Sequence, residues 1–455
     1  MEFFNFMLMP TVGYNGEEVV LRAPAATGTN LAMVLQYTGW EDECLSWKNG
    51  CYFGTSLSGF SPTYKITGPG AISFFKDFFV NSFENFPEGR AKHGIMCRED
   101  GIIMNDGVIM HTSGDEYLTN WLNPYIQYCF ETNQKKYNAV GENITGQMFL
   151  YQIAGSTSLQ ILEKASGDNL HGIKFFHSKY AKIAGHEVII LRLGMAGTLA
   201  YEVHGPADVS TDVYNTIWKA GQNYGMKKLG QVAYMCNHTE DGFPQANYHF
   251  PYPWYEDPKF SEWLHRFPGM GWINFNSIFL GSMGSDPKKR YRNPVELGWG
   301  GVIRFDHDFV GREALQNLVR NPSRVIVTLE WNADDVADVF RSQFDGSERP
   351  YQSIEAPNTF NFINGRTVYV ADRVLVDGKP VGISSGRCRS VFYHKMISLC
   401  SIEPKYAEIG TEVTVIFGDE GHRQKEIRAK VARFPYLREE RNSDVDVNKI
   451  PHGNE

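Results

Sequence analysis

The chain lacks the features that mark several large classes of protein. Its 455 residues carry a formal net charge of −8 with no block of basic residues, which excludes a general nucleic-acid-binding surface. Its seven cysteines include no C-x-x-C pair, so neither a disulfide framework nor a common zinc cluster is expected. No apolar run is long enough to span a bilayer. We therefore expect a protein that acts on neither nucleic acid nor membrane.

Motifs of several common enzyme classes are missing as well. The sequence has no G-x-G-x-x-G, no G-x-x-x-x-G-K-[ST] and no H-E-x-x-H. Histidines such as His111, His238 and His249 are scattered, and a lone histidine is more often a hydrogen-bonded residue than a metal ligand. We expect no metal site, and an enzyme that uses a bound organic cofactor or positioned acids.

The apolar stretch at residues 1–10 differs from a secretory signal. Glu2 precedes most of it, no basic flank is present, and Pro10 ends it before signal-peptide length. The unpaired set of cysteines favours a reducing compartment. We therefore expect a cytoplasmic protein.

Hydrophobic patterning predicts mixed helices and strands in the first two thirds of the chain. Apolar residues from Ile72 to Phe83 recur at helical spacing, which favours a helix packed on a core. Residues 94–118 alternate β-rich runs with Asp-Gly turns, as in an antiparallel meander. A second β-rich run at 183–204 precedes a helix expected at about 207–224.

After residue 322 the pattern changes to one strand after another. Residues 323–440 are therefore expected to form a separate all-β domain of ordinary size. Residues 441–455 are polar and are expected to form a surface tail. The remaining region, 1–322, holds the mixed elements.

Three segments resemble, in order, those of the glycine-cleavage T-protein family. They are "LRLGMAGTLAYEVHGP" (191–206), "LGQVAYMCNHTEDG" (229–242) and "NPVELGWGGVIRFDHDFVGREAL" (293–315). Within that family the nearest likeness is to the aryl O-demethylases. The resemblance implies tetrahydrofolate as the cofactor. It also implies a multi-domain α+β fold, in which a mixed α/β folate-binding region of two intertwined subdomains precedes a C-terminal antiparallel β-barrel.

Glu202 matches the family glutamate that holds the pterin ring. A pterin presents an N–H and an amino donor side by side, and a carboxylate accepts both through two charge-assisted hydrogen bonds. The neighbouring Tyr201 and Met195 are assigned to the same cofactor site. Without the resemblance, Glu202 would be read as a salt-bridged or solvent-facing strand residue.

Tyr234 stands where T-proteins that process an aminomethyl group typically have an arginine. A phenol supplies one proton and an aromatic face instead of a fixed cation, which makes an aminomethyltransferase unlikely as the activity. Near a departing phenolate oxygen, the hydroxyl of Tyr234 could donate a hydrogen bond, an effect of roughly 10²- to 10⁴-fold on rate. The alternative is a buried core tyrosine.

Asn105 and Asp106 lie in "GIIMNDGVIM" (101–110), which lines up with the family segment that carries two adjacent aspartates. The resemblance places both residues beside the reacting centre and leaves open which of them has an acid role. Asn-Asp-Gly is also a hairpin turn by itself, so a purely structural role is the alternative.

A long aromatic segment, 243–272, separates the second and third blocks. It is rich in rings and prolines, which suits the wall of a pocket for a flat aromatic substrate. A surface loop that packs its own rings against the barrel is the alternative. The residues predicted to contact substrate are Tyr248, His249, Phe250, Tyr252 and Trp254.

The function predicted from these residues is a tetrahydrofolate-dependent methyltransferase. It would demethylate a small aromatic methyl ether, of the vanillate or syringate kind, to a phenol and form 5-methyltetrahydrofolate. A second hypothesis keeps the cofactor but opens a methylenedioxy ring, or demethylates an amine or sulfonium compound. A third is a non-enzymatic folate-binding maturation factor.

Overall fold

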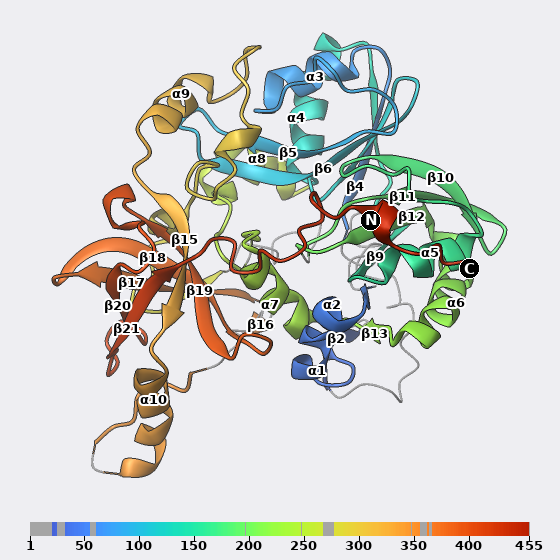
Figure 1. Cartoon of the computed structure of the whole chain (residues 1–455). Helices are drawn as coiled ribbons and strands as arrows, with labels where there is room; N and C mark the ends of the chain where they lie inside the picture. The colour runs from blue at the N-terminus through green and yellow to red at the C-terminus, as the bar shows by residue number, and fades with distance from the viewer. Residues whose placement is uncertain are drawn as a thin grey trace.

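The computed structural model shows a chain built around one buried helix, α7 (Gln231–Asp241), with β-structure on several sides of it (Figure 1). A mixed lobe lies above and to the right of α7 in this view, and a barrel lies to the left. The structure describes residues 21–24, 32–54, 61–195, 197–246, 248–266, 277–346, 348–354, 362–363 and 366–454.

The first sheet is a five-stranded antiparallel sheet covered by aromatic helices. Its strands, in spatial order, are β5 (Ala91–Cys97), β6 (Ile103–Ser113), β7 (Glu116–Asn120), β4 (Thr63–Thr67) and β8 (Val140–Asn143). The consecutive pairs β5–β6 and β6–β7 confirm the predicted meander. The core contains side chains from α3 (Ala71–Phe78) and α4 (Tyr125–Asn133). The predicted helix ends at Phe78, because Phe79 turns into extended backbone and bridges to Met96.

The second sheet has six strands and a helical layer on one face. Its order is β10 (Ser178–Ile183), β11 (His186–Leu191), β12 (Ala200–Pro206), β9 (Met148–Ala154), β3 (Tyr52–Gly54) and β13 (Lys227–Lys228). Only the β13–β3 pair is parallel among these described strands. Apolar side chains of α5 (Ser158–Ser166) and α6 (Ser210–Gly221) share one core with this face.

The C-terminal region forms a closed antiparallel barrel of six strands. These are β17 (Arg366–Val376), β18 (Lys379–Ser390), β19 (Lys395–Ile402), β15 (Val325–Trp331), β21 (Lys425–Ala432) and β20 (Glu412–Phe417). Pairing of β17 with β20 closes the ring, which confirms the predicted barrel. Two short strands, β14 (Ile278–Leu280) and β16 (Phe362–Ile363), extend β17 outside it. The sheet thus takes one strand from before residue 322.

Shorter elements complete the described fold. They are the β1 (Leu21–Pro24) and β2 (Ala32–Gln36) pair, α1 (Trp40–Cys44), α2 (Ser46–Asn49), α8 (Pro258–Leu264), α9 (Arg312–Arg320) and α10 (Ala333–Asp345). Among the described helices, none combines the length and the apolar character needed to cross a membrane.

Residues 437–454, here called the C-terminal segment, return from the barrel to the six-stranded sheet (Figure 1). The sequence predicts a polar surface tail after residue 440; most of its described residues are exposed or half-exposed, and the segment is bound to the body of the protein. Buried Arg192, just after β11, donates to the backbone oxygens of Asn442 at 2.7 Å and Val445 at 3.0 Å. The tail is held because these carbonyl groups find their hydrogen-bond donor inside the protein.

We expect Arg192→Met to lower the free energy of unfolding by about 3–5 kcal/mol, because several buried carbonyl groups lose a charged donor. Urea unfolding measures the change. Arg341→Met, which removes an exposed arginine paired with Asp338 on α10, is the control and should have little effect. Equal stability of the two variants would show that Arg192 does not hold the C-terminal segment.

Candidate functional site around helix α7

Glu202 lies on the face of the six-stranded sheet that is turned away from α5 and α6. It is 5% exposed, and its Oε2 is 3.1 Å from Nε2 of His204. In the antiparallel pair of β12 with β9, Glu202 stands directly opposite Gln152. Directly opposite residues project to the same face. A carboxylate and an amide therefore lie side by side.

The amide of Gln152 is oriented by a third residue. The hydroxyl of Tyr52, on β3, donates to Oε1 of Gln152. The buried Nε2 of Gln152 has no hydrogen-bond partner among the described residues. Since an unsatisfied buried donor costs about 1–3 kcal/mol, such an atom is a candidate for a ligand contact. The face of the sheet at β12 and β9 thus offers one acceptor group and one donor group.

Tyr201 and Met195, the other residues predicted to bind the cofactor, pack in different hydrophobic clusters. Successive residues of a strand point to opposite faces. Tyr201 therefore enters the core shared with α5 and α6, on the other face from Glu202. Met195 packs against the cluster that contains Ala200 and Tyr234. The structure brings Met195 to the side of Glu202 and keeps Tyr201 away from it.

Tyr234 lies on α7, in the same buried cluster as Tyr52. Burial raises the pKa of Tyr234, and the charge of Glu202 raises it further, so the phenol stays protonated. Its ring meets the ring of His238 edge-on, with the centroids 4.6 Å apart. Residues four apart share one side of a helix. Tyr234 and His238 therefore present a phenol and an imidazole together.

His238 has one ring nitrogen fixed and one without a described partner. Nδ1 lies 2.9 Å from the backbone oxygen of Phe243, which accepts only, so Nδ1 carries the hydrogen. Nε2 is buried and unpaired within the described ranges. Burial lowers the pKa of His238 to about 4, against the opposing effects of Phe243 and of the charge of Asp106. The imidazole is therefore neutral at pH 7, with a lone pair on Nε2.

Asp106 reaches the same region from β6 of the other sheet. Its Oδ2 is 2.9 Å from Nε2 of His93, and the hydroxyl of Tyr252 donates to its Oδ1 at 2.6 Å. The ring of His93 lies 5.2 Å from that of Phe243, which in turn lies 6.1 Å from that of His238. The five-stranded sheet thus reaches His238 of α7 through the ring of Phe243.

Asn105 precedes Asp106 on β6 and makes different contacts. Its amide nitrogen donates to the backbone oxygen of Trp121 at 2.6 Å, whereas its buried Oδ1 has no partner in the described part of the chain. The Asn-Asp-Gly run lies inside the long strand β6 and forms no hairpin turn. The turn alternative for these residues is therefore wrong.

The predicted substrate-contacting residues of the aromatic segment pack in two places: two contact the barrel and α7, and three pack in the core of the five-stranded sheet. Tyr248 donates to the backbone oxygen of Arg387 in the barrel, and Nε2 of His249 lies 3.2 Å from Oγ1 of Thr239 on α7. Phe250, Tyr252 and Trp254 belong instead to the core cluster of the five-stranded sheet.

Within that second group the rings form a continuous wall. Tyr252 and Trp254 stack at 5.4 Å, Phe250 meets the ring of Trp299, and Nε1 of Trp254 donates to the backbone oxygen of Met104. All five residues predicted to contact substrate are buried, whereas Tyr255 of the same segment is exposed. Tyr252 also donates a hydrogen bond to Asp106, one of the residues predicted to be catalytic.

Sequence reasoning did not single out several residues that the structure places here. They are Tyr52, His93, Gln152, Asn237 and His238. Asn237 is fully buried and neither polar atom of its side chain has a partner among the described residues. The spacing of His238 from Tyr234 is a signal that helical periodicity offers. No local sequence pattern marks Gln152 or His93, because the register between paired strands decides which residues they face.

Comparison with known proteins identifies the family. The sequence pattern of the GCVT N-terminal domain matches residues 23–249. A sesamin methylene transferase from Sinomonas sp. is 43% identical over 422 residues, which cover 92% of this chain and 93% of that protein. This chain belongs to the GCVT family. A syringate O-demethylase from Sphingobium sp. is 30% identical, over 90% of this chain and 91% of that protein.

A solved structure of the GCVT family has the same fold. Glycine cleavage system aminomethyltransferase T from Bartonella henselae superposes with a TM-score of 0.64, over 90% of this chain and 92% of that chain, at 14% identity. Together, these comparisons confirm the predicted family, the α+β fold with its barrel, and an enzyme of tetrahydrofolate-dependent one-carbon transfer.

We expect the stability of this GCVT-family enzyme to depend on pH through His238. In the unfolded chain its pKa is about 6.5, so between pH 6.5 and about 4 the unfolded state binds a proton that the folded state does not. The free energy of unfolding therefore falls as the pH falls. His238→Gln removes this contribution, so wild type should lose about 3 kcal/mol relative to the variant between pH 7 and pH 4.

Urea unfolding at several pH values between 4 and 7 checks this expectation. His186→Gln, which changes a partly exposed histidine beside Asp212, is the control. A difference between wild type and His238→Gln that stays constant with pH would contradict a buried neutral imidazole.

Proposed function

We propose that this enzyme opens the methylenedioxy ring of an aromatic compound and passes the methylene carbon to tetrahydrofolate. The site observation that carries the proposal is the pairing of the buried Glu202 carboxylate with the unpartnered amide nitrogen of Gln152. The 43% identity to a protein named sesamin methylene transferase, over nearly the whole of both chains, supports the choice of donor.

The pair of Glu202 and Gln152 suits the edge of a pterin. The ring's N–H and amino donors match the two oxygens of a carboxylate, and its carbonyl oxygen matches an amide donor. Both protein groups are buried, which strengthens these bonds relative to water. The described residues therefore fit the pterin, whereas either group alone would match only one part of its edge.

The residues on α7 suit an aromatic ether better than an amine. The phenol of Tyr234 and the imidazole of His238 are both neutral, so neither supplies or balances a charge. When bound, tetrahydrofolate supplies a nucleophilic nitrogen that takes the one-carbon unit. In this proposal Tyr234 donates a hydrogen bond to the departing aryl oxygen, and Nε2 of His238 accepts a proton.

The five-stranded sheet contributes the other wall of the proposed site. Tyr252, hydrogen-bonded to Asp106, and Phe250 offer ring faces to a flat substrate. Asp106 and the unpartnered Oδ1 of Asn105 lie beside the reacting centre in this proposal. Tyr248, His249 and Trp254 act indirectly, because their polar atoms bind Arg387, Thr239 and Met104.

Demethylation of an aromatic methyl ether is the second candidate function. The 30% identity to a protein named syringate O-demethylase, over 91% of that protein, favours it. The two reactions differ in the oxidation level of the carbon. A methylenedioxy ring plus two folate N–H groups gives a catechol and methylenetetrahydrofolate. A methyl ether plus one N–H group gives a phenol and methyltetrahydrofolate.

We expect purified enzyme with tetrahydrofolate and a methylenedioxy arene such as sesamin to yield a catechol and 5,10-methylenetetrahydrofolate, separated by chromatography and identified by mass. Parallel reactions contain syringate or vanillate. Formation of 5-methyltetrahydrofolate from these ethers alone would replace the first function with the second. Folate binding without turnover of either donor class would favour a folate-binding maturation factor.

We expect substitutions of Glu202 and Tyr234 to change different quantities: the first tetrahydrofolate affinity, the second kcat. Glu202→Gln should weaken tetrahydrofolate binding by about 10- to 100-fold, because a charged acceptor is lost. Tyr234→Phe should lower kcat by about 100-fold and leave folate binding nearly unchanged. Calorimetric titration and initial rates measure these effects.

Glu187→Gln, the same change at an exposed position on the neighbouring strand β11, is the control for Glu202. Wild-type folate affinity in Glu202→Gln would show that the pterin lies elsewhere. Wild-type kcat in Tyr234→Phe would show that this hydroxyl does not assist the leaving oxygen.

A further inference from the structure

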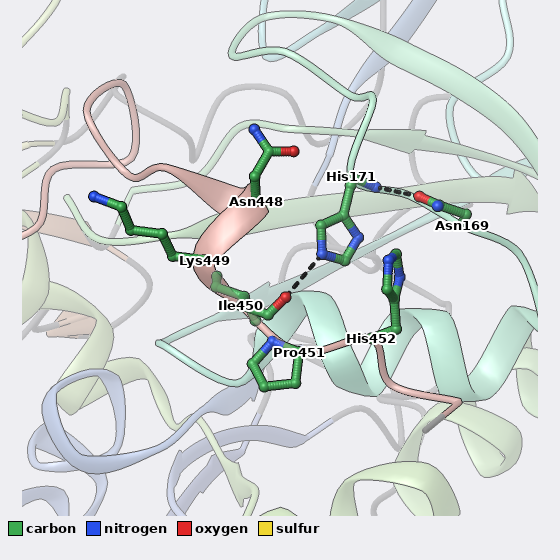
Figure 2. Close-up of a pocket in the computed structure, with 7 residues that line it drawn as sticks. All are labelled: Asn169, His171, Asn448, Lys449, Ile450, Pro451 and His452. Carbon is green, nitrogen blue, oxygen red and sulfur yellow. Dashed lines mark hydrogen bonds between the residues drawn. The ribbon is translucent and has the colours of Figure 1, made fainter.

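A cluster of metal-ligand side chains lies where the C-terminal segment meets α5. Glu163 is on α5, His171 is in the loop after it, and His452 is in the C-terminal segment. Figure 2 shows the two histidines. One ligand atom from each residue lies within 4.8 Å of the others. Oε1 of Glu163 is 2.8 Å from Nδ1 of His171, and Oε2 is 3.5 Å from Nδ1 of His452.

His171 is oriented as a metal-binding histidine would be. Its Nε2 lies 3.0 Å from the backbone oxygen of Ile450, shown as a dashed line in Figure 2. A carbonyl only accepts, so Nε2 carries the hydrogen and donates to it. Nδ1 faces Oε1 of Glu163 at 2.8 Å, a contact that either a proton or a metal ion can bridge. Histidine ligands usually donate their other N–H to a carbonyl or carboxylate group in this way.

Glu163 is held in place by the backbone on both sides. Its side chain is fully buried, and its two oxygens accept from the N–H groups of Leu170 at 2.8 Å and Gly453 at 2.9 Å. A carboxylate has about four lone-pair sites, so each oxygen keeps one for a further partner. These remaining sites are available toward His171 and His452.

The third ligand and the access route lie toward solvent. The side chain of His452 is 41% exposed, and its ring centroid is 4.0 Å from that of His171. Both rings line a pocket of about 510 Å³. The pocket is bordered by Asn169, Asn448, Lys449, Ile450 and Pro451 (Figure 2). It leaves room for a metal ion to enter and for water to complete its coordination.

We propose that Glu163, His171 and His452 bind a divalent transition metal, zinc being the best match, which fastens the C-terminal segment to α5. Two imidazoles and a carboxylate are a known zinc ligand set. Tetrahedral ligands at about 2.1 Å from zinc lie roughly 3.4 Å apart. The separation of Glu163 Oε2 from Nδ1 of His452, 3.5 Å, already fits, and that of Glu163 Oε1 from Nδ1 of His171, 2.8 Å, must lengthen by about 0.6 Å, so the carboxylate would offer a different oxygen toward each histidine.

The position of this site indicates a structural role. Helix α5 covers the face of the six-stranded sheet that contains Tyr201, whereas Glu202 lies on the opposite face. A metal held by Glu163 would therefore join two parts of the chain without meeting the folate. The inference differs from the sequence expectation of no metal site, because three separated residues form the cluster only after folding.

The test uses the full chain, stripped with EDTA, dialysed and titrated with zinc chloride by calorimetry. We expect one zinc per chain and a higher Tm with zinc, because the ion binds only the folded protein. His452→Ala should weaken zinc binding by at least about 100-fold and abolish the shift in Tm. This variant changes a partly exposed ring, so it spares the buried hydrogen bonds of Glu163. His186→Ala, at a partly exposed histidine outside the cluster, is the control and should behave as wild type.

Two results would overturn the proposal. One is a wild-type chain that binds no zinc, in which case a proton alone occupies the space between His171 and Glu163. The other is a His452→Ala variant with unchanged zinc affinity. Cobalt substitution adds a spectroscopic check, since sulfur-to-metal charge-transfer bands would place the metal on cysteine instead of on imidazole and carboxylate.

Discussion

The burial of polar side chains on α7 is the constraint on which the rest of the structure depends. A buried polar group must find a partner inside the protein, and α7 obtains its partners from several regions. Glu240 accepts from Trp47 and from Ser390 of the barrel, and Asp241 pairs with Arg441. One helix therefore fixes the N-terminal elements, the barrel and the C-terminal segment relative to one another.

The same helix also carries the polar groups that remain without protein partners. Asn237 and Nε2 of His238 are buried and unpaired in the part of the chain that the structure describes, as is Nε2 of Gln152 on the six-stranded sheet. Structural bonds concentrate at the end of α7, near Glu240, and unsatisfied groups lie one turn earlier. This division is what a binding site needs, since rigid surroundings hold donors and acceptors ready for a ligand.

Much of the site was predictable from residue type and order, and the exceptions have a common cause. The resemblance of three blocks to the T-protein family pointed to Glu202 and Tyr234, and the structure brings them close enough for the charge of Glu202 to raise the pKa of Tyr234. Tyr201 was grouped with Glu202 by adjacency, but strand alternation sends it into the opposite core. The tail after residue 440 was read from its polarity, which does not reveal that buried Arg192 binds its backbone.

The sequence by itself determined many local elements and the all-β character of the C-terminal region, because hydrophobic period and turn residues are local properties. Its ordered motifs gave the family resemblance, and that resemblance implied the barrel. Only the tertiary structure decided which residues from distant segments meet. Gln152 stands opposite Glu202 through strand register, His93 reaches Asp106 across a hairpin, and His452 joins Glu163 after the chain returns from the barrel. Such contacts depend on packing over hundreds of residues, and no short stretch of sequence encodes them.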